Sequence, residues 1–177
     1  MVITAACGQG KVTKVLTIEK ERDNIEKKIG NNVIVLVKTH GQEDLMKVID
    51  KQWPENIETT FNILQNQSGR IIYVAEFPTS ESGDWFVIIK RYFNDGGRII
   101  ALEKEFKYFN ESCTSGSVIS TLIELYDVDF SVIQSTETLT DNKGNKLSRK
   151  ECGNEMEPRI ERIKTVDELT LLKKIRV

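Results

Sequence analysis

Few side chains in this sequence could act in catalysis. It contains one histidine, His40, and three cysteines, Cys7, Cys113 and Cys152. A hydrolase of the serine or cysteine type needs a nucleophile, a base and a group that orients the base. His40 follows Thr39 in a stretch typical of a helix start, and no Gly-x-Ser-x-Gly turn occurs to supply a nucleophile for it. The sequence therefore favours a surface histidine over a catalytic one.

Carboxylates supply the next candidate chemistry, because the chain has 27 Asp and Glu residues. Glu103 and Glu105 are two residues apart in a predicted strand, so both side chains face the same side of the sheet. Such a pair could act on a glycan, as in glycoside hydrolases, or hold a cation. So many acidic residues also produce pairs by chance on the solvent side of a strand. We predict no catalytic pair, no metal site and no cofactor.

Composition limits the class of partner. The chain has 177 residues, of which 39% are apolar and 29% charged, as in a globular protein. Lys and Arg number 25 against 27 acidic residues, for a net charge of -2. Nucleic-acid binding draws on an excess of basic residues, so we expect no nucleic-acid partner. No apolar run reaches the roughly eighteen residues that a membrane-spanning helix needs.

Small residues lead up to the first cysteine, in the order Ala5-Ala6-Cys7, and Gly8, Gln9 and Gly10 follow. This segment resembles the lipobox that ends the signal peptide of bacterial lipoproteins. Thr4 stands where Leu, Val or Ile is usual in that family. The resemblance implies that Cys7 carries lipid, including palmitate, and tethers the chain to the periplasmic face of a bacterial membrane. The basic n-region and most of the apolar h-region of such a signal peptide are missing, so under this resemblance the native start would lie upstream of Met1. A cytoplasmic start with a chance cysteine is the alternative.

The two remaining cysteines form an even number if Cys7 is acylated. A periplasmic location would permit Cys113 and Cys152 to pair. We therefore expect a disulfide between them, with two free thiols as the alternative. The bridge would close a loop of about forty residues and stabilise the fold by about 3–4 kcal/mol.

Hydrophobic periodicity predicts helices near the N-terminus. Residues 8–17 begin with the short or polar side chains of Gly8, Gln9 and Gly10, and we expect this segment to form a flexible tether. Apolar residues at helical spacing predict a helix over 18–29. A β-branched run over 33–37 predicts a buried strand. A capping box and an apolar stripe predict a second helix over 39–53, which ends before Pro54.

The apolar pattern then changes to the period of two that is typical of strands. Predicted strands cover 57–64, 70–77, 85–93, 98–109, 118–126 and 130–139. Thr165 and Glu168 form another capping box, which favours a closing helix. We predict an α+β fold, an antiparallel β-meander sheet with N-terminal helices packed on one face. The chain would hold a signal-peptide remnant and tether over 1–17 and one domain over 18–177.

Aromatic side chains gather on two central strands, 85–93 and 98–109. Strand alternation divides them between two faces, one of which must form the core. The other could form an exposed surface for a partner. The candidate partner surface consists of Trp85, Tyr92, Phe93 and Tyr108. The alternative is that helices and loops cover both faces.

Three segments of the middle third, 80–85, 92–98 and 106–113, resemble small exported lipoproteins of Gram-negative bacteria. This resemblance implies export and no particular activity. The sequence favours a lipid-anchored, envelope-associated, non-catalytic binding module with a protein or glycan partner. The alternatives are a small carboxylate-dependent hydrolase of envelope glycans or peptides, and a lipoprotein inhibitor or immunity protein.

Overall fold

The structure, a computed structural model, describes residues 6–80, 82–153 and 157–177. In chain order the elements are α1 (Ala6–Glu26), a 3-10 turn (Gly30–Asn32), β1 (Ile34–Thr39), β2 (Met46–Lys47), β3 (Ile57–Gln65), β4 (Ile71–Pro78), β5 (Trp85–Phe93), β6 (Ile99–Phe109), β7 (Ser117–Tyr126), β8 (Val132–Asp141), α2 (Arg149–Cys152) and α3 (Val166–Leu172). The predicted α+β fold with an antiparallel meander is confirmed.

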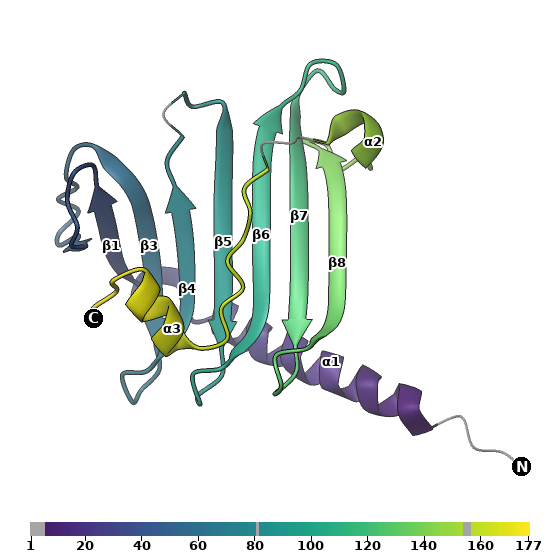
Figure 1. Ribbon diagram of the computed structural model, residues 1–177, viewed down its shortest axis with the longest axis horizontal. Helices are drawn as coiled ribbons and strands as arrows, with labels where there is room; N and C mark the ends of the chain where they lie inside the picture. Colours follow the sequence, from purple (N-terminus) through teal and green to yellow (C-terminus); the bar gives the residue numbers. More distant parts are fainter. Residues whose placement is uncertain (1–5, 81, 154–156) are drawn as a thin grey trace, which may run out of the picture.

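One antiparallel sheet of eight strands organises the molecule, in the order β2-β1-β3-β4-β5-β6-β7-β8. Figure 1 shows α1 running obliquely behind the strands and the yellow C-terminal segment crossing in front of them. We call residues 157–177 the strap, the sheet face under it the front face, and the face on which α1 packs the back face. All the strands predicted from residue 57 onward are present, with ends that differ by at most two residues.

Four hairpin turns share one arrangement. In each, the side chain of an Asn or Asp accepts a hydrogen bond of 2.9–3.0 Å from the backbone N–H four residues later. These side chains belong to Asn66, Asn94, Asp127 and Asp141. The residue before each donor has a positive φ, and it is glycine in three turns but Phe130 (φ 65°) in the fourth. These local turns set the register of the meander.

The second predicted helix, over 39–53, is wrong. The segment forms turns and the short strand β2, which pairs with β1 and places Lys47 opposite Leu36. Three residues have a positive φ that a helix does not allow: Gly41 (76°), Asp50 (51°) and Lys51 (61°). Pairing with β1 supplies hydrogen bonds to the backbone of this segment, and this gain outweighs the local helical pattern. Ile49 and Trp53 of the predicted apolar stripe are exposed.

The first helix is longer than predicted. Residues 8–17, which we expected to form a flexible tether, lie in the first half of α1. The second half holds the helix on the back face, where Ile25 is buried and Ile18 packs against the same apolar cluster. Ala5 lies outside the described residues, as do the side chains of Ala6 and Cys7. Processing at Cys7 and a domain that begins at residue 18 stay predictions.

The strap covers the apolar centre of the front face. Ile163, Leu169 and Ile175 are buried in one cluster with side chains of the strands. The predicted closing helix is present as α3, and the Thr165 hydroxyl accepts a hydrogen bond of 3.2 Å from the Glu168 N–H. This N-cap stabilises the start of a helix that is only seven residues long.

Ion pairs with buried strand residues also hold the strap. Arg162 donates two hydrogen bonds to the Glu124 carboxylate of β7, at 2.7 and 3.1 Å. The Lys104 ammonium of β6 lies 2.6 Å from Glu157 at the start of the strap. Arg162 lowers the pKa of Glu124 against the opposing effect of burial. Burial acts to raise the pKa of Glu157, but hydrogen bonds from Lys104 and Ser120 outweigh it and lower that pKa.

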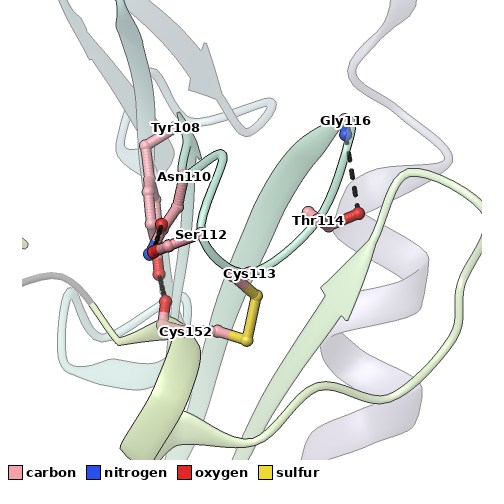
Figure 2. The surroundings of a disulfide bond; sticks show 7 residues. All are labelled: Tyr108, Asn110, Ser112, Cys113, Thr114, Gly116 and Cys152. Carbon is pink, nitrogen blue, oxygen red and sulfur yellow. Dashed lines mark hydrogen bonds between the residues drawn. A yellow bond between two sulfur atoms is a disulfide. The ribbon is translucent and has the colours of Figure 1, made fainter.

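The predicted disulfide joins Cys113 and Cys152, which are 39 residues apart. Cys113 lies in the loop after β6, and Cys152 ends α2 (Figure 2). The hydroxyl of Tyr108 donates a hydrogen bond to the backbone carbonyl of Cys152. The bridge and this hydrogen bond attach α2 to the edge of the front face.

Removal of the disulfide should destabilise the fold. The double variant Cys113→Ala/Cys152→Ala should lose about 4 kcal/mol in free energy of unfolding, because its unfolded chain regains the freedom of the closed loop. Urea denaturation of both proteins, each produced under oxidising conditions, measures this loss. Equal midpoints would contradict the structural role of the bridge.

Acid should loosen the strap. The pKa values of Glu124 and Glu157 are lowered by their partners, so these ion pairs stabilise the fold at neutral pH, and this contribution is lost as pH falls through the lowered values. Protection factors of the strap amides, which correct for the pH dependence of intrinsic amide exchange, should therefore fall as the solution is acidified below about pH 5. In the Glu124→Gln variant, the strap amides should exchange faster at pH 7, and their protection should change less on acidification. The matched control is Glu55→Gln, at an exposed position before β3, and an identical acid response in both variants would refute this role for Glu124.

Candidate functional site

The predicted aromatic partner surface is not an exposed surface. Tyr92, Phe93 and Tyr108 are all buried, so this prediction is wrong for three of its four residues. Tyr92 packs on the back face against Tyr73, with ring centroids 5.2 Å apart, whereas Phe93 and Tyr108 belong to front-face clusters. α1 and the strap cover these parts of the sheet, as the alternative interpretation expected. Trp85 is half-buried and lines a cleft on the front face.

The other chemical candidates lie apart from one another. His40 is exposed in the turn after β1. Glu103 lies on the back face, where the Lys90 ammonium is 3.0 Å from it and 3.6 Å from Glu26. Burial opposes the charge on Lys90, but these two carboxylates outweigh it and raise the pKa of Lys90. Glu105 is half-buried on the same strand.

The largely apolar cleft at one end of the sheet is the stronger candidate. We call it the α1 cleft, because α1 forms one wall and the turns after β5 and β7 form the other. Its volume is about 570 Å³. The lining residues are Gly10, Thr13, Lys14, Thr17, Ile18, Glu21, Asn94, Arg98, Ile99, Ile100, Tyr126, Asp127 and Val128. A volume of this size lies within the range of roughly 300–1,000 Å³ found for small-molecule sites.

The lining combines a buried apolar part with charged groups. Ile99, Ile100 and Tyr126 are buried in the flanking apolar clusters. Arg98 donates a hydrogen bond of 3.1 Å to the Val128 carbonyl and so links the two turns. Burial, with a smaller contribution from the charge of Asp95, raises the pKa of Glu21. The cleft therefore offers apolar surface to a ligand and both signs of charge to orient it.

The second carboxylate of the α1 cleft, that of Asp127, already accepts hydrogen bonds within its turn. Asp127 accepts hydrogen bonds of 3.0 and 2.9 Å from the backbone N–H groups of Asp129 and Ser131. Its role in the turn leaves Glu21 as the carboxyl most available to a ligand. A two-carboxylate hydrolase needs both groups free to face the substrate, so this arrangement is suited to binding. Within the described part of the chain, no cluster of three or more His, Cys, Asp and Glu side chains could hold a metal ion.

α1 connects the cleft to the predicted anchor. Cys7 lies in the first turn of α1, three residues before Gly10. Gly10, Lys14 and Glu21 follow one another at spacings of four and seven residues, which place them along one side of the helix. At 1.5 Å per residue, the backbone of Cys7 is about 5 Å along the axis from Gly10 and about 21 Å from Glu21.

Sequence reasoning missed the α1 cleft because it assigned residues 8–17 to a tether. The helical spacing of Val12, Val15, Leu16 and Ile18 is the signal that could have extended the helix. Val12 and Leu16 are each 60% exposed, whereas Val15 and Ile18 pack against the back-face cluster. The cleft itself forms between segments far apart in the sequence, so local patterns do not predict it.

Comparison of the chain with protein-family models, curated proteins and solved structures finds no match. A function for this protein is therefore inferred from its own residues. Among its described residues, no helix has both the length and the apolar character needed to cross a bilayer.

Proposed function

We propose that this protein is a lipid-anchored, non-catalytic binding module on the periplasmic face of a bacterial membrane, and that its ligand is a membrane amphiphile. In this proposal, the α1 cleft receives the apolar part of the ligand. The observation that carries the proposal is the apolar cleft of about 570 Å³ whose wall is the helix that contains Cys7.

The Cys113–Cys152 bridge supports the proposed periplasmic location. Disulfides persist in oxidising environments, so the bridge indicates a non-reducing compartment. The bacterial periplasm is such a compartment, and an acylated Cys7 would hold the protein at its membrane. The mature lipoprotein form carries several acyl chains, and more than one chain is needed for stable anchoring.

The continuous helix supports a position near the bilayer. A flexible tether would let the domain move away from the membrane, whereas α1 connects Cys7 to the sheet through helical residues. With Cys7 at the surface, every residue of α1 that lines the cleft lies within about 21 Å of the anchor along the helix. An amphiphile could then enter the cleft directly from the bilayer.

The first half of α1 also suits contact with lipid. Val12 and Leu16 are exposed, and four residues apart they lie on one side of the helix. Lys11 and Lys14 stand beside them in the sequence, and the first acidic residue after Cys7 is Glu19. Basic and apolar side chains together favour the surface of an anionic membrane.

A protein partner is the second candidate, as for an inhibitor or immunity protein. Phe86 and Phe109 are 43% and 68% exposed on the back face. Phe86 pairs with Lys107 of β6, two residues from Phe109, so the two rings are diagonal neighbours. An exposed aromatic pair of this kind is typical of a contact surface.

Acylation at Cys7 should be detectable in the native host. Metabolic labelling with a palmitate analogue should label the native protein in the membrane fraction, whereas Cys7→Ser should stay unlabelled and leave that fraction. Recovery of an unlabelled native chain that retains Met1 from the cytosol would refute the anchor.

Filling the α1 cleft should weaken ligand binding. Thr17→Trp places a large ring on the lining and should weaken binding of a lysophospholipid with a fluorescent acyl chain at least tenfold. Lys20→Trp adds the same ring at an exposed position of α1 that does not line the cleft, and should bind as the native protein does.

Fluorescence titration with monomeric lipid measures both variants. Equal affinities for Thr17→Trp and Lys20→Trp would contradict a site in the cleft. Loss of binding in a Phe86→Ser/Phe109→Ser variant, with Thr17→Trp unaffected, would assign the ligand to the exposed aromatic pair instead.

A further inference from the structure

The front face contains a second cleft that has no lining residue in common with the α1 cleft. Its volume is about 260 Å³, and it lies between β4, β5 and the strap. Trp85, Val87 and Ile89 give it one apolar wall, and two prolines add to it. Five charged side chains also line it, two of them buried. Ligand sites combine apolar surface with a few placed charges, and a volume just below the range of roughly 300–1,000 Å³ limits the ligand to a small one.

Arg91 is the buried cation of this cleft. Its side chain is 1% exposed, and its Nη1 donates a hydrogen bond of 3.0 Å to the Glu76 carboxylate. Nη2 donates a longer bond, of 3.4 Å, to the backbone carbonyl of Glu161. Nε is buried and has no hydrogen-bond partner in the described part of the chain. A buried guanidinium with an unmatched N–H is unfavourable unless a further acceptor is present.

The charges of the lining do not cancel. The Lys173 ammonium lies 3.0 Å from Glu76 and 2.9 Å from Glu161, and Arg91 also pairs with Glu76. These two cations and two carboxylates balance. The remaining charged residue of the lining is Arg159, which is exposed, so the cleft has one excess positive charge. A ligand with one negative charge would neutralise it.

We propose that this cleft binds a small monocarboxylate with a flat apolar body. The body lies against Trp85 and the aliphatic side chains of β5, and the carboxylate accepts hydrogen bonds from the guanidinium groups of Arg159 and Arg91. A guanidinium and a carboxylate make strong, charge-assisted hydrogen bonds with matched geometry. The ring of Trp85 gives a flat surface on which a planar body packs well.

The proposal is independent of the α1 cleft and of lipid anchoring. A purely structural ion-pair network would hold the strap in place but would not distinguish an anion from a cation of the same shape. A cleft that binds an anion more tightly than a cation or a neutral molecule of the same shape is therefore a ligand site, and a cleft that does not discriminate is a structural network.

Phenylacetate is the probe, with benzylamine and benzyl alcohol as its cationic and neutral counterparts. Heteronuclear NMR follows the indole N–H of Trp85, and the exposed Trp53 serves as an internal reference. Phenylacetate should give a saturable shift of the Trp85 signal and leave that of Trp53 in place. The two counterparts should bind at least tenfold more weakly.

Two variants complete the test without removal of a buried ion-pair partner. Arg159→Gln should weaken phenylacetate binding at least fivefold, whereas Lys150→Gln, on the exposed surface of α2, should bind as the native protein does. The proposal is overturned if millimolar phenylacetate leaves Trp85 unshifted, if benzylamine binds equally well, or if Arg159→Gln binds as tightly as Lys150→Gln.

Discussion

The rest of the structure depends on the burial of charged side chains on the front face of the sheet. Glu76, Arg91, Lys104 and Glu124 come from four consecutive strands, and all are buried. Each has an opposite charge in the strap or on a neighbouring strand, at 2.6–3.0 Å. Loss of one partner from a pair buried on both sides, such as Glu76–Arg91, costs about 3–5 kcal/mol. The pairs with Glu157, Arg162 and Lys173 hold the strap even where it has no regular secondary structure. With the front face closed in this way, α1 is left to cover the back.

Sequence patterns predicted the structure correctly where residues close together in the chain determine it, as in the turns between strands. The strands from β3 to β8 are separated by turns whose Asn, Asp and Gly residues are visible in the sequence, as at Asn94 and Gly97. The strand after Asp127 was predicted to start at residue 130, but it starts at Val132, because Phe130 belongs to the turn and has the positive φ that glycine has elsewhere. The Phe130 ring stacks on Tyr126, with centroids 5.0 Å apart. The segment 39–53 has a helical pattern, but pairing with β1 overrides it. Both clefts were missed because their walls come from distant segments.

The same helix serves the fold and the proposed function. One end of α1 is fixed by Ile25 in the back-face cluster, and the other contains Cys7. Between them, Thr17 and Glu21 line the α1 cleft. Packing at one end therefore fixes the orientation of the cleft, and an anchor at the other would fix its distance from a bilayer. The disulfide, at the opposite end of the sheet, stabilises the fold in a non-reducing compartment without contact with this site.

The most direct test of binding in the α1 cleft is native mass spectrometry of the protein extracted from its own membrane. The account predicts an acylated Cys7 and, in addition, a non-covalent lipid that stays with the native protein and is absent from Thr17→Trp. A native protein that carries no lipid beyond the acyl groups, or a Thr17→Trp variant that retains the same lipid, would contradict it.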